Sequence, residues 1–111
     1  MLHRVKEYTP IELDIKKDPV FLDVVNEIDK ETLKKYEEKI ENNIKIDPVN
    51  VIKVKNKENI LEELDVSELI SLTREARKDE WIYIITDGCH RATAHRNKKK
   101  NIPAYLIWID E

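Results

Sequence analysis

The sequence predicts a single domain of the α/β (α+β) class, with a small mixed sheet and flanking helices. The chain has 111 residues, a length that suits one domain. Hydrophobic residues make up 41% of it, which is enough for one core and excludes a disordered tail. Strand-like and helix-like segments alternate along the chain, without an internal repeat, a low-complexity tract or a linker. We therefore expect residues 1–111 to form one domain.

The first half of the chain is expected to contribute two strands and one helix. Hydrophobic and polar side chains alternate over residues 11–15, which indicates a short strand. Residues 20–25 are apolar and fit either a turn of helix or a loop. Asp29 has the chemistry of a helix N-cap, and hydrophobic side chains follow at helical spacing, which predicts a helix to about residue 43. Residues 49–54 are strand-like and follow an Asp-Pro pair.

The second half begins with a long stretch that is expected to be helical. This stretch covers residues 59–78, with a break at residues 65–67, where Ser67 can cap a second helical piece. Residues 81–86 form a continuous β-branched and aromatic run, which is typical of a central strand covered on both faces. A helix from residue 89 to about residue 99 is expected next. A last strand over residues 103–109, which begins at a proline, completes the chain.

Composition excludes several classes of protein. A single cysteine excludes an internal disulfide framework and a multi-cysteine metal site. No apolar run approaches the ~18 residues of a membrane span, and the N-terminus does not resemble a signal peptide, so we expect a soluble cytoplasmic protein that does not contact membranes. Charged residues reach 39%, glutamine is absent and methionine occurs once, which is the compositional pattern of a thermophile protein.

Charge and glycine content both single out the last part of the chain. Residues 1–87 hold 15 lysines and arginines against 21 acids, whereas residues 88–109 hold five such cations, two histidines and no acid. Gly88 is the only glycine, where an average chain of this length has roughly eight. Because the chain avoids glycine elsewhere, we expect the backbone to need it at this position.

The run at residues 81–86, Gly88 and the following helix form a strand–turn–helix element. The first turn of a helix has backbone N–H groups without partners and carries a partial positive charge. Gly88 lets a ligand approach the backbone closely, and His90 and Arg91 add cationic donors at the same end. Together these features predict a phosphate site. His95 lies about one turn further along and is expected to face solvent.

The string Asp-Gly-Cys-His-Arg at residues 87–91 resembles the motif of the ParB/sulfiredoxin superfamily. The resemblance continues through Ala92, Ala94 and the start of the last strand at residues 102–104. Upstream, the capped helix and the proline-led strand at residues 47–51 are similar in order to the superfamily's elements, so most of the chain is covered.

The resemblance implies a small α/β domain that binds nucleotide phosphates at this turn, with residues 55–80 as a helical insertion relative to compact members. Members of the superfamily differ in activity. Archaeal free-serine kinases carry a D-G-H-H-R string, sulfiredoxins a G-C-H-R string, and chromosome-partitioning ParB domains a G-E-R-R string followed by a helix-turn-helix domain. This sequence shares residues with the first two strings, lacks the Glu-Arg form and shows no DNA-reading module, so DNA is not the favoured partner.

The serine-kinase resemblance implies a phosphotransferase that moves a phosphoryl group from ATP or ADP, with Mg²⁺, to a small hydroxyl substrate such as free serine. Glu27 best fits the position of the base that these kinases take from their N-terminal segment, and Asp23 is the second candidate. Asp87 is the candidate for holding Mg²⁺ or orienting the substrate. The expected phosphate ligands share the turn: Gly88, Cys89, His90 and Arg91.

The sulfiredoxin resemblance instead implies ATP-dependent thiol chemistry at Cys89. A thiol at a helix N-terminus beside a histidine and an arginine is expected to have a lowered pKa, which favours the thiolate. Sulfiredoxins carry a lysine at the start of the helix where this sequence has Thr32. They also have a basic residue in the N-terminal segment, where this sequence has none between Lys17 and Lys30. A third hypothesis is a ParB-like module that senses nucleotide or associates with DNA.

Overall fold

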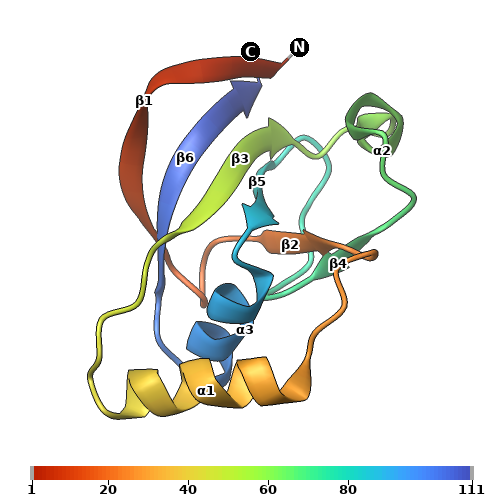
Figure 1. Cartoon of the computed structure of the whole chain (residues 1–111). Helices are drawn as coiled ribbons and strands as arrows, with labels where there is room; N and C mark the ends of the chain where they lie inside the picture. Colours follow the sequence, from red (N-terminus) through yellow and green to blue (C-terminus); the bar gives the residue numbers. More distant parts are fainter. Residues whose placement is uncertain (1, 111) are drawn as a thin grey trace.

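The computed structural model describes residues 2–110. Within that range six strands form one mixed sheet (Figure 1). The strands are β1 (Leu2–Leu13), β2 (Val20–Asp23), β3 (Val49–Lys55), β4 (Leu69–Ser71), β5 (Trp81–Asp87) and β6 (Ile102–Asp110). Their order across the sheet is β1-β6-β3-β5-β2-β4, which confirms a single α/β domain with a mixed sheet.

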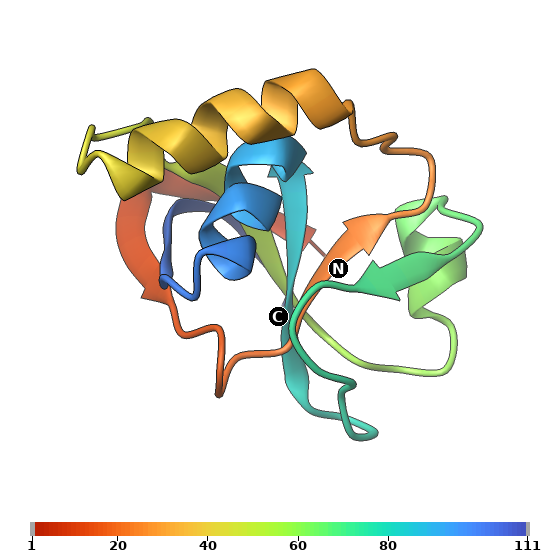
Figure 2. The ribbon, with the colours of Figure 1, turned by 90° about the horizontal axis from the view of Figure 1, so that it is seen from below.

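Three helices pack on this sheet: α1 (Lys30–Glu41), α2 (Ile60–Leu64) and α3 (Cys89–Asn97). Figure 2 shows α1 and α3 lying against each other on one side of the sheet and α2 on the other side. The sheet is therefore covered on both faces near its centre. No helix between residues 2 and 110 is long and apolar enough to cross a bilayer.

The buried side chains form two clusters, one on each face of the sheet. Val51 of β3 and Ile85 of β5 belong to the cluster under α3. Ile52 of β3 and Ile84 of β5 belong to the cluster under α2. The two central strands thus bury side chains in both directions, which confirms the prediction of a central strand covered on both faces at residues 81–86.

Helix α1 confirms the predicted cap. The Asp29 carboxylate accepts hydrogen bonds from the Thr32 N–H at 3.0 Å and from Thr32 Oγ1 at 2.6 Å. These hydrogen bonds hold the pKa of Asp29 below its ordinary value. The helix ends at Glu41, and Asn43 follows with a φ of 56°, the left-handed conformation that commonly terminates helices.

Residues 20–25 contain a strand, β2, and not the turn of helix or loop that the sequence left open. Val20 and Leu22 are buried on the α3 face and Phe21 on the opposite face. Because both faces are buried, all three side chains are apolar. The alternation of polar and apolar residues that would indicate a strand is therefore absent. β2 pairs in parallel with β5 and antiparallel with β4. β1 also begins well before its predicted start.

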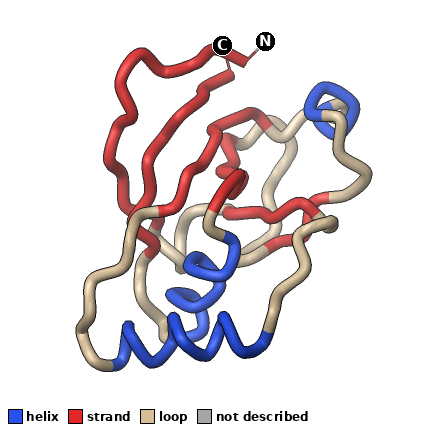
Figure 3. Tube along the Cα trace, viewed as in Figure 1, coloured by secondary structure: helices blue, strands red, loops and turns tan. Residues whose placement is uncertain are grey.

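The prediction of helix over residues 59–78 is wrong beyond the short helix α2. Asp65 adopts a φ of 55° and ends α2, and the helical piece expected after Ser67 is strand β4. β4 pairs with β2, with Ile70 opposite Leu22. Figure 3 shows that most of the remaining chain between β3 and β5 is loop. Pairing with a distant segment has thus overridden the local helical spacing.

The first and last strands pair with each other. β1 and β6 run antiparallel, from Leu13 opposite Ile102 to Leu2 opposite Asp110. β6 also pairs in parallel with β3, so the pair is continuous with the rest of the sheet. Residues 2 and 110 consequently lie side by side, at the end of the sheet remote from α1 and α3 (Figure 1).

Candidate functional site

The turn between β5 and α3 has the predicted strand–glycine–helix geometry. β5 ends at Asp87, Gly88 occupies the N-cap position with a φ of 96°, and α3 begins at Cys89. Gly88 has no side chain with which to cap the helix. The Ala92 N–H donates to Gly88 O at 2.9 Å, so helix geometry leaves the N–H groups of residues 89–91 without intrahelical partners. An anion can bind at these groups.

Two constraints require glycine at position 88. Its φ of 96° lies in the left-handed region, which side chains with a Cβ rarely adopt. A Cβ would also lie 2.7 Å from Val49 Cγ1 and 2.8 Å from Arg91 Nη2. Val49 is fully buried and cannot move aside, so the turn can pack against β3 only without a side chain.

A cavity of about 380 Å³ opens at this turn. Its lining comes from two segments that are distant in sequence, residues 25–36 and residues 86–91. Glu27 lies in the first segment, so the structure brings the predicted base candidate to the predicted phosphate site. Asp23 does not line this cavity, and its carboxylate accepts a hydrogen bond from the Val25 N–H at 3.1 Å.

Arg91 reaches the cavity and also fastens α3 to the start of β3. Its Nη1 donates to Asp47 O at 3.2 Å and to Pro48 O at 3.1 Å. Its Nη2 lies 3.6 Å from the Asp87 carboxylate, and 17% of the side chain is exposed. The predicted phosphate ligand therefore has a structural role as well, with Nε and Nη2 as the nitrogens that can still donate to a phosphate.

His90 acts as an acceptor and not as the second cationic donor that the sequence predicts. The Asp29 N–H donates to Nε2 of His90 at 2.9 Å. That nitrogen carries no proton in this arrangement, and the ring can donate only from Nδ1. The hydrogen bond joins the N-cap of α1 to the first turn of α3, and this holds the starts of both helices at the cavity.

Cys89 does not have the lowered pKa that its position at a helix N-terminus predicts. The side chain is 9% exposed, and burial raises the pKa of the thiol. The negative charges of Asp87 and, to a lesser degree, Asp23 raise it further. These effects outweigh the helix terminus because a thiolate here would be poorly hydrated and close to carboxylates. The expectation of a thiolate is therefore wrong.

The Asp87 carboxylate is 73% exposed beside the Arg91 guanidinium. In the described part of the chain, no three histidine, cysteine or acidic side chains are grouped to hold a metal ion. Nucleotide sites usually bind Mg²⁺ through one or two carboxylates together with phosphate oxygens and water. Asp87 and Glu27, which both line the cavity, are oxygen donors of this kind.

Sequence reasoning did not assign Tyr36 and Thr86 to the site, although both line the cavity. The signal available for Tyr36 was its spacing of one helical turn from Thr32, which places both on one face of α1. The prediction that His95 faces solvent is wrong. Its side chain is 8% exposed and its Nδ1 lies 2.7 Å from Arg91 O, because α1 packs beside α3.

The fold and the site define this protein as an α/β domain with a mixed sheet and an uncapped βα turn beside a polar cavity. Comparisons with protein-family models, with curated proteins and with solved structures find no match. What the chain does must therefore be inferred from the residues of this cavity.

Proposed function

We propose that the chain is a nucleotide-binding phosphotransferase of the ParB/sulfiredoxin type, which moves a phosphoryl group from ATP or ADP to a small hydroxyl substrate such as free serine. One observation carries the proposal: a single cavity contains the uncapped first turn of α3, the guanidinium of Arg91 and the carboxylate of Glu27. Phosphoryl transfer requires positioned phosphates, positive charge and a group that orients or deprotonates the hydroxyl. The cavity offers each of these.

The N–H groups of residues 89–91 bind the phosphates, where the helix dipole adds positive charge. Arg91 adds a planar set of donors that matches phosphate oxygens. The carboxylates of Asp87 and Glu27 outnumber the one cationic side chain that lines this cavity, so a free polyanion would be repelled. Asp87 would hold Mg²⁺ that arrives with the nucleotide, and the ion would supply positive charge to offset this repulsion.

Glu27 accepts the proton of the substrate hydroxyl. Its side chain is exposed and lines the cavity from the segment opposite the turn. Asn26, Thr32 and Tyr36 surround it with neutral hydrogen-bonding groups, which suit a small polar acceptor. Glu27 therefore has more support as the base than Asp23, which lies outside the cavity lining.

The geometry gives less support to thiol chemistry at Cys89. A nucleophilic cysteine needs exposure and a stabilised thiolate, whereas Cys89 is buried and its pKa is raised. Cys89→Ser separates the two activities. A phosphotransferase keeps most of its activity in this variant, and a thiol enzyme loses all of it.

The test is to incubate the protein with Mg²⁺, ATP or ADP and a panel of amino acids and sugars, and to look for a new phosphoester by phosphorus NMR. We expect Glu27→Gln to lower the rate by about a hundredfold or more, the usual contribution of a general base. Glu38→Gln, at an exposed position of α1 outside the cavity, is the matched control and should leave the rate unchanged.

Calorimetry of ATP, ADP and CTP binding completes the test. Failure to bind any nucleotide would contradict the proposal outright. Nucleotide binding without turnover of any hydroxyl compound would contradict the transferase activity and favour the ParB-like sensing module. Affinities that are the same in Arg91→Ala and in the wild type would remove Arg91 from the site.

A further inference from the structure

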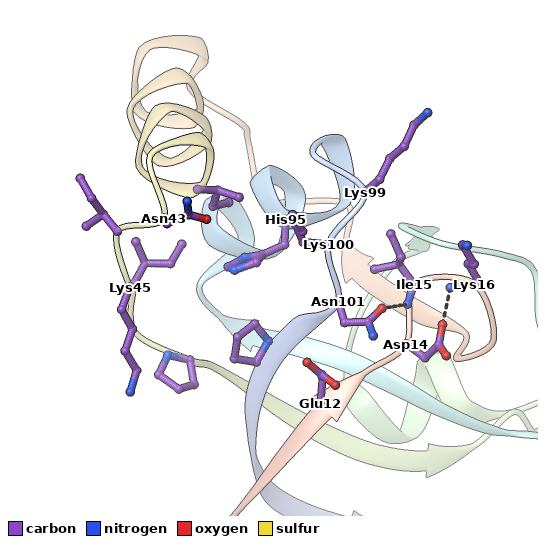
Figure 4. A pocket seen from close by; sticks show the side chains of 15 residues that line it. Glu12, Asp14, Ile15, Lys16, Asn43, Lys45, His95, Lys99, Lys100 and Asn101 are labelled. Atoms are coloured by element: carbon purple, nitrogen blue, oxygen red, sulfur yellow. Dashed lines mark hydrogen bonds between the residues drawn. The ribbon is translucent and has the colours of Figure 1, made fainter.

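A second cavity, of about 780 Å³, lies at the opposite end of α3 from the βα turn (Figure 4). We call it the His95 cavity; its lining residues come from the segments 12–16, 40–48 and 95–103. These segments include the C-terminal ends of α1 and α3 and the connections that follow them. The volume lies within the ~300–1,000 Å³ of small-molecule sites. Nothing in the proposed function uses this cavity.

His95 is the buried polar group of this cavity. Its side chain is 8% exposed, and Nδ1 donates to Arg91 O at 2.7 Å, so Nε2 is the nitrogen without a proton. Burial lowers the pKa of His95, which keeps the ring neutral. Across the described residues, no side-chain N or O atom is both fully buried and unpaired. Nε2 has no hydrogen-bond donor among the described residues, so it is not fully buried and is open as an acceptor. Figure 4 shows the ring projecting into the cavity.

The charged side chains that line the His95 cavity favour an anion. Four lysines line it against two carboxylates. One of these carboxylates, Asp14, already accepts hydrogen bonds from the N–H groups of Lys16 at 2.8 Å and Lys17 at 3.3 Å. N–H groups of the residues that follow each helix engage three carbonyls near its end: those of Glu38, Lys39 and Ile40 in α1, and those of Ala94, His95 and Arg96 in α3. With four lysines against Glu12 and the hydrogen-bonded Asp14, the lining side chains carry a net positive charge.

Apolar side chains complete the lining. Four isoleucines and two prolines border the His95 cavity. Ile44 is 52% exposed, which leaves a large apolar side chain uncovered by the protein itself. Asn101 adds a polar group near this surface: its Oδ1 accepts the Ile15 N–H at 3.3 Å, and its Nδ2 can donate to a ligand.

We propose that the His95 cavity binds a small organic anion that combines an aliphatic body with a hydroxyl group, of the 2-hydroxycarboxylate class. The lysines attract the carboxylate, the isoleucines cover the aliphatic body, and the hydroxyl donates to Nε2 of His95. The site stands apart from the phosphotransferase proposal, because it uses none of the residues that line the cavity at the βα turn.

The test uses the wild-type protein and four compounds. The compound 2-hydroxy-4-methylpentanoate has all three features; 4-methylpentanoate lacks the hydroxyl, 2-hydroxy-4-methylpentanamide lacks the charge, and glycolate lacks the aliphatic body. Nitrogen-15 NMR of the His95 ring follows binding, because the Nε2 resonance moves when that nitrogen accepts a hydrogen bond. We expect the complete compound to move this resonance and to bind at least about fivefold more tightly than each of the others.

A pair of lysine variants locates the anion. Lys100→Gln removes one cation of the cavity, and Lys34→Gln removes an exposed lysine of α1 outside it. We expect binding to be about threefold weaker in Lys100→Gln and unchanged in Lys34→Gln. The proposal is overturned by equal affinities of these two variants, by equal binding of the amide and the carboxylate, by an unmoved Nε2 resonance, or by no binding up to about 10 mM.

Discussion

The two ends of α3 each border a cavity, and the two cavities differ in the groups that line them. At the first turn they include open backbone groups, the N–H groups of residues 89–91, beside the side chains of Arg91, Asp87 and Glu27. At the last turn they are side chains, with a buried histidine, lysines and isoleucines. The difference arises because N–H groups are open at one end, whereas at the other end the N–H groups of residues 98–100 engage the carbonyls of Ala94, His95 and Arg96.

Both ends of α3 also use a left-handed residue. Gly88 precedes the helix with a φ of 96°, and Lys99 follows it with a φ of 57°. Non-glycine residues adopt positive φ elsewhere too: Asn43, Asp65 and Asp79. This chain therefore tolerates the strain of left-handed residues with a Cβ. At position 88 a second constraint adds to the left-handed φ, because a Cβ there would collide with Val49 and Arg91.

The largest effect is expected from Gly88→Ala. The added Cβ would lie 2.7 Å from Val49 Cγ1, at a φ that strains alanine. We expect the free energy of unfolding, measured by urea denaturation, to fall by about 3 kcal/mol. Lys99→Gly, beyond the other end of the helix, should raise it by about 1 kcal/mol because it relieves strain. Similar changes in both variants would contradict the difference between the ends.

A smaller loss of stability is expected from Arg91→Ala. The variant loses the two hydrogen bonds from Nη1 to Asp47 O and Pro48 O, so the free energy of unfolding should fall by about 2 kcal/mol. Arg96→Ala is the matched control near the other end of α3. Arg96 donates to a distant segment at Leu72 O, at 3.3 Å, and its bonds of 3.1 and 2.8 Å go to the exposed side chain of the adjacent Asn97. The free energy of unfolding of Arg96→Ala should fall by less than about 1 kcal/mol. Equal losses would mean that Arg91 does not fasten α3 to β3.

Cys89, at the first turn, should resist alkylation. Burial raises the pKa of its thiol above the ordinary value of 9.0. The stability that this group contributes is therefore present below about pH 9 and is lost as the pH rises further. In mildly alkaline buffer, iodoacetamide should react about tenfold more slowly with the folded protein than with the chain in urea. Faster reaction of the folded protein would revive the thiol hypothesis.

The smallest effect on stability is expected from His95, near the last turn of α3. This effect should occur as the pH is lowered. Burial lowers the pKa of its ring from the ordinary value of 6.5. Its contribution to stability is therefore present above about pH 6.5 and is lost as the pH falls through the lower folded value. We expect the thermal midpoint to fall more on mild acidification in the wild type than in His95→Gln. An equal fall would assign the effect to other groups.

Local signals predicted part of this fold. Glycine's conformational freedom and an aspartate's capping oxygen act within a few residues, so Gly88 and Asp29 were recognisable from sequence. Strands β2 and β4 were not, because each depends on pairing with a distant segment. The apolar run in β2 is buried on both faces, and this removes the alternation that identifies a strand.

The candidate site was also predictable only in part. The motif placed residues 88–91 together, and the resemblance suggested Glu27, which does line the same cavity. The state of Cys89 could not be read from its neighbours in sequence, because its raised pKa comes from burial and from the charges of folded-state neighbours. The burial of His95 likewise depends on how α1 packs beside α3.

The pairing of the first and last strands has a practical consequence. Residues 2 and 110 emerge at one corner, at the end of the sheet remote from α1 and α3 (Figure 1), and neither residue lines either cavity. A fluorescent or affinity fusion attached at that corner would leave both openings unobstructed. A short linker between the same two positions would also permit a circular permutant, with new termini in the loop between β4 and β5.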